Sequence, residues 1–204
     1  MDVATYAADG AEIVGQTGEL VCRNAHVSMP VGFWNDANGS RYEAAYFSGF
    51  PGVWAHGDFV EHRATGGYVI HGRSDAALNP GGVRIGTAEI YRQVETIAEV
   101  IEAVAVGQEW QGDQRIVLFV RLRPGVELTE DLQKAIRSRI RSGTTPRHVP
   151  ARILAVTEIP RTRSGKISEI AVRDTIHGRT LGNDTALANP ECLVAYRNLP
   201  ALAE

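Results

Sequence analysis

The sequence predicts a mixed α/β (α+β) protein, and two kinds of pattern support this class. Strand-like runs rich in Val, Ile, Tyr and Trp flank a glycine-rich turn at residues 65–67. Farther along the chain, Ile and Val recur at intervals of three to four residues, which is the period of an amphipathic helix. No internal repeat is found, so a solenoid is not expected.

The composition is that of an ordinary globular protein. Of the 204 residues, 44% are hydrophobic and 22% are charged, which excludes a disordered or collagen-like chain. With 21 basic and 24 acidic side chains, the net charge of -3 offers no general attraction for nucleic acid or an acidic membrane. Cys22 and Cys192 lack metal-site spacing, and neither a secretory leader nor an apolar run of about 20 residues is found. We therefore expect a cytoplasmic protein with no metal site, nucleic-acid partner or membrane partner.

The first strand is expected at residues 18–22, after a polar stretch that carries glycines. Because no helix cap, apolar helix or core-like segment precedes this strand, we expect the chain to begin where a longer protein is interrupted. Two more strands, at 54–61 and 68–71, are separated by Thr65-Gly66-Gly67 and predict a β-hairpin.

An amphipathic helix is expected after the loop at residues 79–82, with Thr87 as its N-cap. Its apolar positions recur at helical spacing and are Ile90, Val94, Ile97 and Ile101. Strands rich in Val and Ile follow at 102–107 and 115–122, and Gln111-Gly112-Asp113 supplies the turn between them.

A second helix is capped by Thr129, and the acids Glu130 and Asp131 suit the positive end of its dipole. Its apolar face consists of Leu132, Ile136 and Ile140. A strand at 152–156, a polar turn at 161–166 and a last helix at 169–176 follow. The tail after Gly178 is expected to be mostly loop, with residues 193–199 as a helical option.

Candidate binding residues surround the predicted hairpin. The ionised carboxylate of Asp58 offers two acceptor oxygens, which suit the vicinal hydroxyls of a ribose, although the residue alone favours a turn Asp that caps its own backbone. Arg73 and Arg84 suit a phosphate ester because a guanidinium donates paired hydrogen bonds, but solvated surface charges explain them equally well. Asp75 lies where the hairpin meets the helical region and is a candidate hinge.

Lys134 and Lys166 are the only lysines among the 21 basic residues. Lys is a slim point charge that can reach a single oxygen through a narrow channel, unlike the wide fork of Arg. Lys166 follows a Ser-Gly turn, and such a loop can swing a cation towards an anionic intermediate. A solvated basic loop is the alternative that these residues alone favour.

The region from Arg137 to Lys166 carries eight basic residues against one acid, Glu158. This local excess of positive charge predicts a site for a nucleotide-phosphate or polyphosphate ligand. RNA is a weaker alternative, because few aromatic residues accompany the charges and base stacking would lack platforms.

Taken in order, residues 54–58, 72–75, 81–90 and 160–166 resemble the closing motifs of the acyl-adenylate-forming enzymes. Within this family, segment 78–90 and the tail at 183–198 are most similar to ligases that activate acetoacetate. The resemblance implies two steps. Acetoacetate and ATP give an acyl-adenylate and pyrophosphate, and the thiol of CoA then displaces AMP. The implied cofactors and substrates of the full enzyme are ATP, Mg²⁺, CoA and acetoacetate.

The resemblance also implies roles for the matched residues in adenylation. Asp58 would hold the ribose of AMP, and Arg73 would contact the ribose and its phosphate. Asp75 would be the hinge about which a small mobile domain rotates between the half-reactions. Lys166 would bridge the substrate carboxylate and the α-phosphate, and so stabilise the charge that builds up as pyrophosphate leaves.

Other matched residues concern the nucleotide phosphates and CoA. Arg84 would approach the nucleotide phosphates, and Gly81 and Gly82 would let the pantetheine of CoA pass close to the backbone. Arg141, at the end of the second helix, would bind a phosphate of CoA.

The chain departs from the family pattern because no large domain with a Gly/Ser/Thr-rich ATP loop and an acyl pocket precedes residue 18. The resemblance then implies that residues 1–74 are the last β subdomain of a large AMP-binding domain. Residues 75–178 would be the mobile C-terminal domain, a short sheet flanked by helices, and residues 179–204 a C-terminal extension. We expect no adenylation by the chain alone, and the missing large domain is a partner to test in trans.

Two alternatives stay open at this point. A ligase for another short-chain acid, of the acetyl or propionyl type, fits the same motifs because the acid pocket would lie in the missing part. A stand-alone CoA- or nucleotide-binding module also fits, and saturable CoA binding without turnover would favour it.

Overall fold

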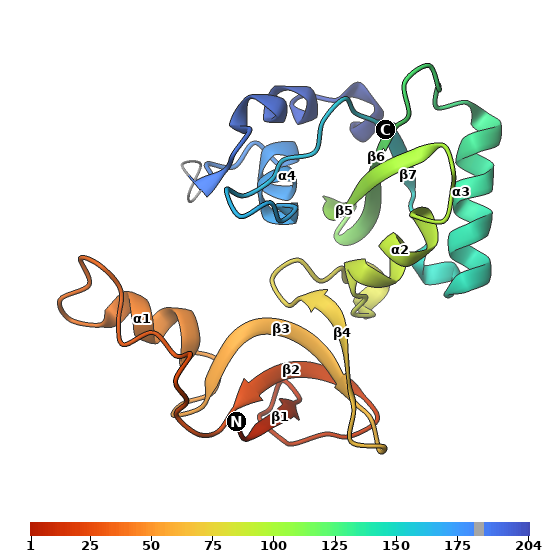
Figure 1. The fold of residues 1–204 in the computed structure, drawn as a ribbon. Helices are drawn as coiled ribbons and strands as arrows, with labels where there is room; N and C mark the ends of the chain where they lie inside the picture. The colour runs from red at the N-terminus through yellow and green to blue at the C-terminus, as the bar shows by residue number, and fades with distance from the viewer. Residues whose placement is uncertain (182–185) are drawn as a thin grey trace. The chain divides into compact units, whose positions relative to one another are not determined.

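The computed structural model describes residues 1–181 and 186–204, which form two compact units, Met1–Asp75 and Ala76–Glu204. Over these residues the chain builds a four-stranded and a three-stranded sheet accompanied by helices (Figure 1), so the predicted mixed α/β class is confirmed. None of the helices described is both long enough and apolar enough to cross a membrane.

The first unit is an antiparallel sheet in the order β1-β2-β3-β4. Its strands are β1 (Val3–Tyr6), β2 (Thr17–Cys22), β3 (Trp54–His62) and β4 (Tyr68–Arg73). The predicted strand at 18–22 and the predicted hairpin are confirmed, with Val60 paired to Ile70 across the hairpin. Ala4, Val21 and Val60 are fully buried, so all of the first three strands contribute to the core.

The sequence patterns predict neither strand β1 nor helix α1 (Ser40–Tyr46). Strand β1 has four residues, and its pairing with β2 makes it a strand, so little in its local sequence signals one. The expectation that no core-like segment precedes residue 18 is therefore wrong, since Ala4 is buried. Helix α1 buries none of its residues and so lacks an apolar stripe. The carboxylate of Asp36 accepts the amides of Arg41 and Tyr42 at 3.1 and 2.9 Å and fixes its start.

The second unit is built on a long hairpin of β5 (Val100–Trp110) and β6 (Asp113–Leu122). Gln111 and Gly112 turn the chain with φ values of 51° and 82°, the conformation that two-residue hairpin loops favour. Strand β7 (Arg152–Ala155) pairs with β6 in parallel after the crossover helix α3 (Glu130–Gly143). The predicted strands are confirmed in place, but the hairpin is longer than predicted, and Asp113 begins β6 instead of belonging to the turn.

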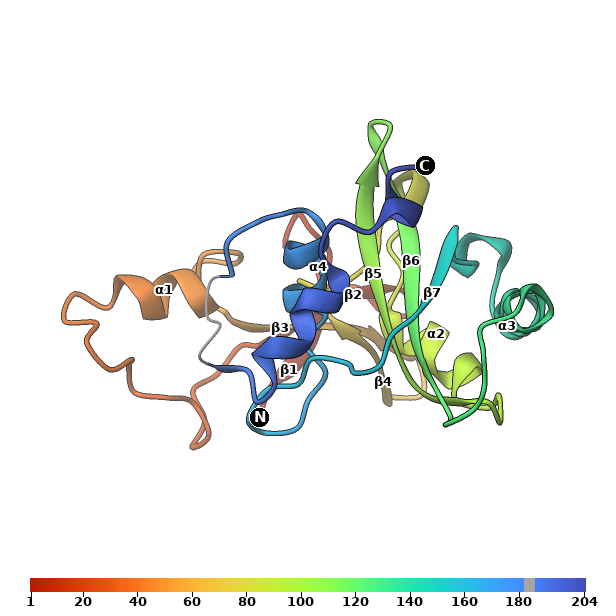
Figure 2. The same ribbon diagram turned by 90° about the horizontal axis from the view of Figure 1, so that it is seen from above.

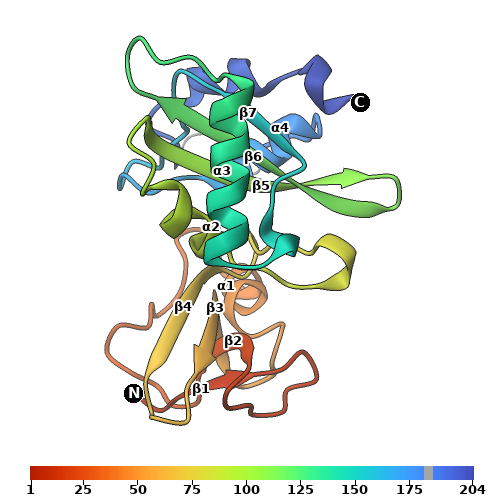
Figure 3. The same ribbon diagram turned by 90° about the vertical axis from the view of Figure 1, so that its right-hand side faces the viewer.

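The β5–β6 hairpin is buried on both faces. One face packs against helices α2 (Thr87–Val94) and α3, and the other against α4 (Glu169–Ile176) and the tail, as the opposite placement of α3 and α4 in Figures 2 and 3 shows. Successive side chains of a strand point to opposite faces, so a sheet covered on both sides needs apolar residues at every position. The first face carries Ala103, Ala105, Ile116, Leu118 and Val120, and the second carries Val104, Val106, Val117 and Phe119.

Helix α2 differs from its prediction at both ends. Gly86 is the N-cap, and Thr87 is the first helical residue, with no side-chain cap hydrogen bond. The helix stops at Val94, and Ile101 belongs to strand β5, where it is 42% exposed. The prediction that the helical face includes Ile101 is wrong, because Val100 and Ile101 already follow the buried–exposed alternation of a strand.

The later elements agree more closely with the sequence. The hydroxyl of Thr129 accepts the amide of Leu132 at 3.2 Å and caps α3, and α4 has its predicted bounds. The tail forms 3-10 helices η4 (Pro190–Tyr196) and η5 (Pro200–Leu202), so the helical option at 193–199 is right in kind but begins too late. The part of the tail resemblance at residues 183–185 lies outside the described residues.

The two isoleucines at the ends of the predicted helical face should differ sharply in their contribution to stability. Ile90 is fully buried, so Ile90→Ala should lower the free energy of unfolding by about 2–5 kcal/mol, because it leaves a cavity. Ile101→Thr keeps a β-branched residue at an exposed strand position and should cost less than about 1 kcal/mol. Urea unfolding followed by circular dichroism measures both values, and equal losses would contradict the structure.

Candidate functional site

Asp58, Arg73 and Asp75 lie side by side at the open end of the β3–β4 hairpin in the first unit. Asp58 and Arg73 are direct cross-strand partners. Nη1 of Arg73 lies 3.5 Å from Oδ1 of Asp58, while its Nε and Nη2 lie 3.4 Å from Oδ1 and Oδ2 of Asp75. One guanidinium therefore links two carboxylates, and the structure brings these three predicted residues together.

Gly57 makes room for this guanidinium. Its φ is 82°, and an added Cβ would lie 2.6 Å from Nη2 of Arg73, so a side chain here would displace the arginine. A pocket with a volume of about 330 Å³ lies beside the group and is lined by Gly57, Arg73 and Asp75. Its other wall is formed by residues of α1 and the following turn, which the sequence patterns do not single out. This volume is at the lower end of the range for small-molecule sites.

The glycine-rich loop precedes α2 in the second unit. Residues Pro80–Gly82 form a single 3-10 turn, η1, in which Gly81 and Gly82 have φ values of 59° and 74°. Such values favour glycine, and both residues are exposed. An added Cβ on Gly82 would meet no described atom within 4 Å, so the backbone of this loop is open to a close approach.

The loop is held by two residues at the start of β6 that sequence reasoning missed as site residues. The carboxylate of Asp113 accepts the amide of Gly81 at 3.0 and 3.1 Å, and Oε1 of Gln114 accepts the amide of Asn79 at 2.5 Å. Gln114 reaches the loop across Gly107, where an added Cβ would lie 2.1 Å from its Cδ. The amide of Gly81 is thus engaged within the protein, and its conformation is fixed by the hairpin tip.

The predicted arginines of the second unit are exposed and lie on separate elements. Arg84 follows the glycine-rich loop, and Arg141 lies in the last turn of α3. Among the contacts described, none joins Arg141 to the glycine-rich loop or to Lys166. Arg147 in η2 (Pro146–His148) lies close to that loop instead, with its Nη1 3.8 Å from an added Cβ on Gly81.

Several members of the predicted basic region brace the fold. Nε of Arg152 donates to the carbonyl of Ala201 at 3.1 Å, and its Nη2 donates to the carbonyl of Glu204 at 2.8 Å. Nε of Arg139 donates to the hydroxyl of Thr96 at 3.0 Å. Because these groups point at different neighbours, the count of basic residues overstates the positive charge open to one ligand.

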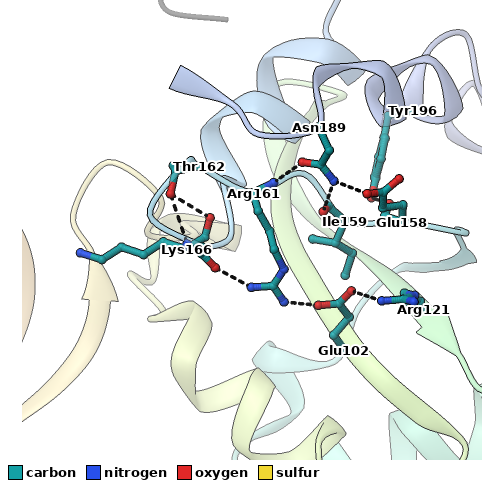
Figure 4. Close-up of polar contacts among 10 residues, drawn as sticks. Glu102, Arg121, Glu158, Ile159, Arg161, Thr162, Lys166, Asn189 and Tyr196 are labelled. Atoms are coloured by element: carbon teal, nitrogen blue, oxygen red, sulfur yellow. Dashed lines mark hydrogen bonds and ion pairs between the residues drawn. The ribbon is translucent and has the colours of Figure 1, made fainter. Parts of the chain in front are cut away.

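Lys166 lies in a short loop that begins and ends in the isolated bridge between Arg161 and Ile167. The amide of Thr162 donates to the carbonyl of Lys166 at 2.8 Å, and the amide of Lys166 donates to the hydroxyl of Thr162 at 3.2 Å. Figure 4 shows the side chain extending away from these bonds. Its ammonium has no hydrogen bond or ion pair with any residue the structure describes. By contrast, Nζ of the exposed Lys134 lies 3.4 Å from Oδ1 of Asp131.

A polar network connects helices α2 and α4, which follow the glycine-rich loop and the Lys166 loop. Oε1 of Glu169, the first residue of α4, accepts the hydroxyls of Tyr91 and Thr87 at 3.1 and 3.4 Å. The Tyr91 oxygen accepts the amide of Ala105 at 3.1 Å and so satisfies a donor of the edge strand β5. Burial, reinforced by the charge of Glu169, raises the pKa of Tyr91 well above its ordinary value, so the hydroxyl keeps the proton that it donates.

The residues that support the Lys166 loop are remote in sequence, and no motif marks them. Glu102 binds Arg161 from 59 positions away, and Asn189 binds the Arg161 backbone from 28 positions away. The one signal available for Glu102 is a charge inside a run of Val and Ile that is otherwise apolar. Asn189 carries no comparable signal.

Comparisons with known proteins show which family the chain is similar to. Residues 89–166 match the family described as the AMP-binding enzyme C-terminal domain, and this range ends at Lys166. The chain is 62% identical over 194 residues to the acetoacetyl-coenzyme A synthetase of Rhizobium meliloti, a match that covers 95% of this chain and 30% of the relative. It is 46% identical over 206 residues to the acetoacetyl-CoA synthetase of Mus musculus, covering 100% of this chain and 31% of that protein.

A solved structure gives the same result for the fold. The acetoacetyl-CoA synthetase from Streptomyces lividans matches with a TM-score of 0.90 and 38% identity, over 100% of this chain and 31% of that one. The chain thus spans about 30% of the length of the relatives it matches. It belongs with the AMP-forming acyl-CoA ligases and corresponds to a C-terminal portion of the acetoacetyl-CoA synthetases.

Proposed function

We propose that this chain works as the C-terminal part of a ligase that activates acetoacetate with ATP and passes the acyl group to CoA. In the first step a carboxylate oxygen of acetoacetate bonds to the α-phosphorus of ATP, and pyrophosphate leaves. In the second step the sulfur of CoA bonds to the acyl carbon, and AMP leaves. The names of the relatives support these substrates. The observation that carries the proposal is the exposed ammonium of Lys166, which pairs with none of the residues in 1–181 and 186–204, on a loop whose backbone is held in place.

Lys166 would act in the first step. Negative charge builds up on the α-phosphate and the leaving pyrophosphate, and a fixed ammonium between the carboxylate and the phosphate stabilises it. A lysine already paired with an acid would lose part of this effect, because its charge would be compensated. The absence of a partner for Lys166 among the described residues therefore supports its role.

The first unit would hold the nucleotide. The carboxylate of Asp58 would accept the ribose hydroxyls. Arg73, whose Nη1 lies 3.5 Å from Oδ1 of Asp58, would contact the ribose and its phosphate. We assign residues 1–74 to the last β subdomain of a large AMP-binding domain, 75–178 to the mobile domain and 179–204 to an extension. Asp75 would be the hinge, and its two contacts to Arg73 would have to rearrange when the domain turns.

The second unit would bind CoA and the nucleotide phosphates. The exposed backbone of Gly81 and Gly82 suits the thin pantetheine chain, since an added Cβ on Gly82 would meet no described atom within 4 Å. Arg84 would approach the nucleotide phosphates, and Arg141 would take a phosphate of CoA. Mg²⁺ would arrive bound to ATP, whose phosphate oxygens are ligands that it prefers. Within the described residues, no group of three or more His, Cys, Asp or Glu could hold a metal ion.

A chimera tests the activity of the chain, both alone and as part of a ligase. The remainder of the Rhizobium meliloti synthetase can be joined to this chain, which replaces the matching 30% of that protein. We expect the chimera to form acetoacetyl-CoA and the chain alone to be silent. CoA binding by the chain alone, with a silent chimera, would favour the binding module.

Lys166→Ala in the chimera should lower acetoacetate-dependent pyrophosphate release by about 100- to 1,000-fold, the usual cost of removing one group that stabilises transition-state charge. Lys134→Ala is the matched control because it removes the other lysine, which pairs with Asp131 on α3. Its rate should equal that of the unmodified chimera. Equal rates for both variants would remove Lys166 from the mechanism.

Asp58→Asn should raise the KM for ATP by about tenfold, since the neutral amide accepts ribose hydrogen bonds less strongly than a carboxylate. The kcat at saturating ATP should change less. Asp9→Asn is the control in the same unit, because Asp9 is exposed and bonds only the amide of Ala11 among the described contacts. Steady-state kinetics with varied ATP distinguish the two, and an unchanged KM for Asp58→Asn would exclude the ribose contact.

A further inference from the structure

Glu102 lies outside the motif at residues 160–166, and its side chain fastens the loop that carries Lys166 by way of Arg161 (Figure 4). Nη1 of Arg161 donates to the carbonyl of Gly165 at 2.7 Å, and Nη2 of the same guanidinium pairs with the carboxylate of Glu102 in β5. Glu102 also accepts Nη1 of Arg121 at 3.0 Å. A single planar group thus connects the sheet to the peptide that immediately precedes Lys166.

Glu102 is suited to hold that group firmly. Its side chain is 13% exposed and lies between two guanidiniums, so its charge is well compensated. Gly165 itself has a φ of 85° and is exposed, which means that the tip would otherwise depend on its own turn. Glu102 fixes one end of the planar Arg161 guanidinium to the sheet. The other end of the guanidinium then fixes the carbonyl of Gly165.

The tail holds the base of the same loop. Oδ1 of Asn189 accepts the amide of Arg161 at 2.8 Å, and its Nδ2 donates to the carbonyl of Ile159 at 3.1 Å. The amide of Ala188 donates to the Arg161 carbonyl at 2.8 Å. Tyr196, which is fully buried against Phe119, donates its hydroxyl to the carbonyl of Glu158 at 2.8 Å. The tail therefore fixes the strand that enters the loop, and Glu102, through Arg161, adds a side-chain brace to the Gly165 carbonyl.

We propose that Glu102 is a positioning residue for Lys166, acting through Arg161 and the Gly165 carbonyl. This inference rests on the proposed function of Lys166. The brace sets the starting point of a long side chain, whose ammonium must meet two oxygens at once. Misplacement of a reacting group by about 1 Å can cost 100-fold in rate, so loosening the loop should affect the step that uses Lys166 and spare the step that does not.

The first test measures the loop in the chain alone, without any activity. Trypsin cleaves after Arg163 and Lys166, and its rate reports how often the loop opens. Glu102→Gln should raise the cleavage rate at these sites by about tenfold. The matched control is Glu109→Gln, on the same strand, which removes the ion pair to Arg179. It should leave the rate unchanged. Asn189→Ala is a second variant that should also accelerate cleavage, should Glu102→Gln fail to fold.

The second test separates the half-reactions in the chimera. Glu102→Gln should lower the rate of pyrophosphate release by about 10- to 100-fold. The rate of acetoacetyl-CoA formation from preformed acetoacetyl-adenylate should stay within twofold of the rate of the unmodified chimera. The melting temperature should stay within a few degrees. A purely structural role would lower both half-reactions together.

The outcomes separate this inference from the proposed function. The role of Glu102 would be overturned by unchanged cleavage in Glu102→Gln and Asn189→Ala, or by equal losses in the two half-reactions. Either result leaves the role of Lys166 intact if Lys166→Ala is still defective in adenylation. A chimera whose adenylation survives Lys166→Ala would overturn the role of Lys166 and, with it, the catalytic meaning of the brace. A silent unmodified chimera would overturn the proposed function itself. Faster cleavage together with a selective loss of adenylation would support both.

Discussion

The burial of the β5–β6 hairpin on both faces is the constraint on which the rest of the second unit depends. A sheet of three strands cannot protect two apolar faces by itself, so α2 and α3 must cover one face and α4 with the tail the other. The glycine-rich loop leads into α2, and the Lys166 loop leads into α4. Both candidate loops are therefore attached to helices that the same sheet holds in place, and the Thr87–Tyr91–Glu169 network connects these helices directly.

The tail is part of this core and not an appendage to it. Leu187, Leu193, Tyr196 and Leu202 lie in the same apolar cluster as Phe119 and Val172. Burial, with a smaller effect from the charge of Glu158, raises the pKa of Cys192 to about 11, so this thiol stays protonated and unreactive near neutral pH. Because the tail is anchored so deeply, Asn189 can fix the backbone of the neighbouring strand that leads to Lys166.

Arginine and lysine have different tasks in this chain. Arg115 stacks on Trp110 at 3.7 Å and donates to the carbonyl of Leu202, and Arg161 braces the Lys166 loop. The guanidinium serves these positions because its planar fork bonds several acceptors at once. A lysine ammonium is a compact charge on a flexible stem, and Lys166 is left without a partner among the described residues. In the loop at residues 161–166, the arginine thus braces the backbone and the lysine presents its charge.

The sequence by itself determined the class of fold, most strands and the helices α3 and α4, because hydrophobic period and capping residues are local signals. It also drew attention to the motif residues that the two units present, but their roles came from the resemblance to the acyl-adenylate-forming enzymes, because the residues alone favoured a turn for Asp58 and a solvated loop for Lys166. Only the tertiary structure decided that Val3–Tyr6 is a strand, that Ile101 leaves the helix, and that Arg73 links Asp58 to Asp75. It alone placed Glu102 and Asn189 against Arg161. Contacts between residues tens of positions apart depend on how elements pack, and no local pattern in the chain encodes that packing.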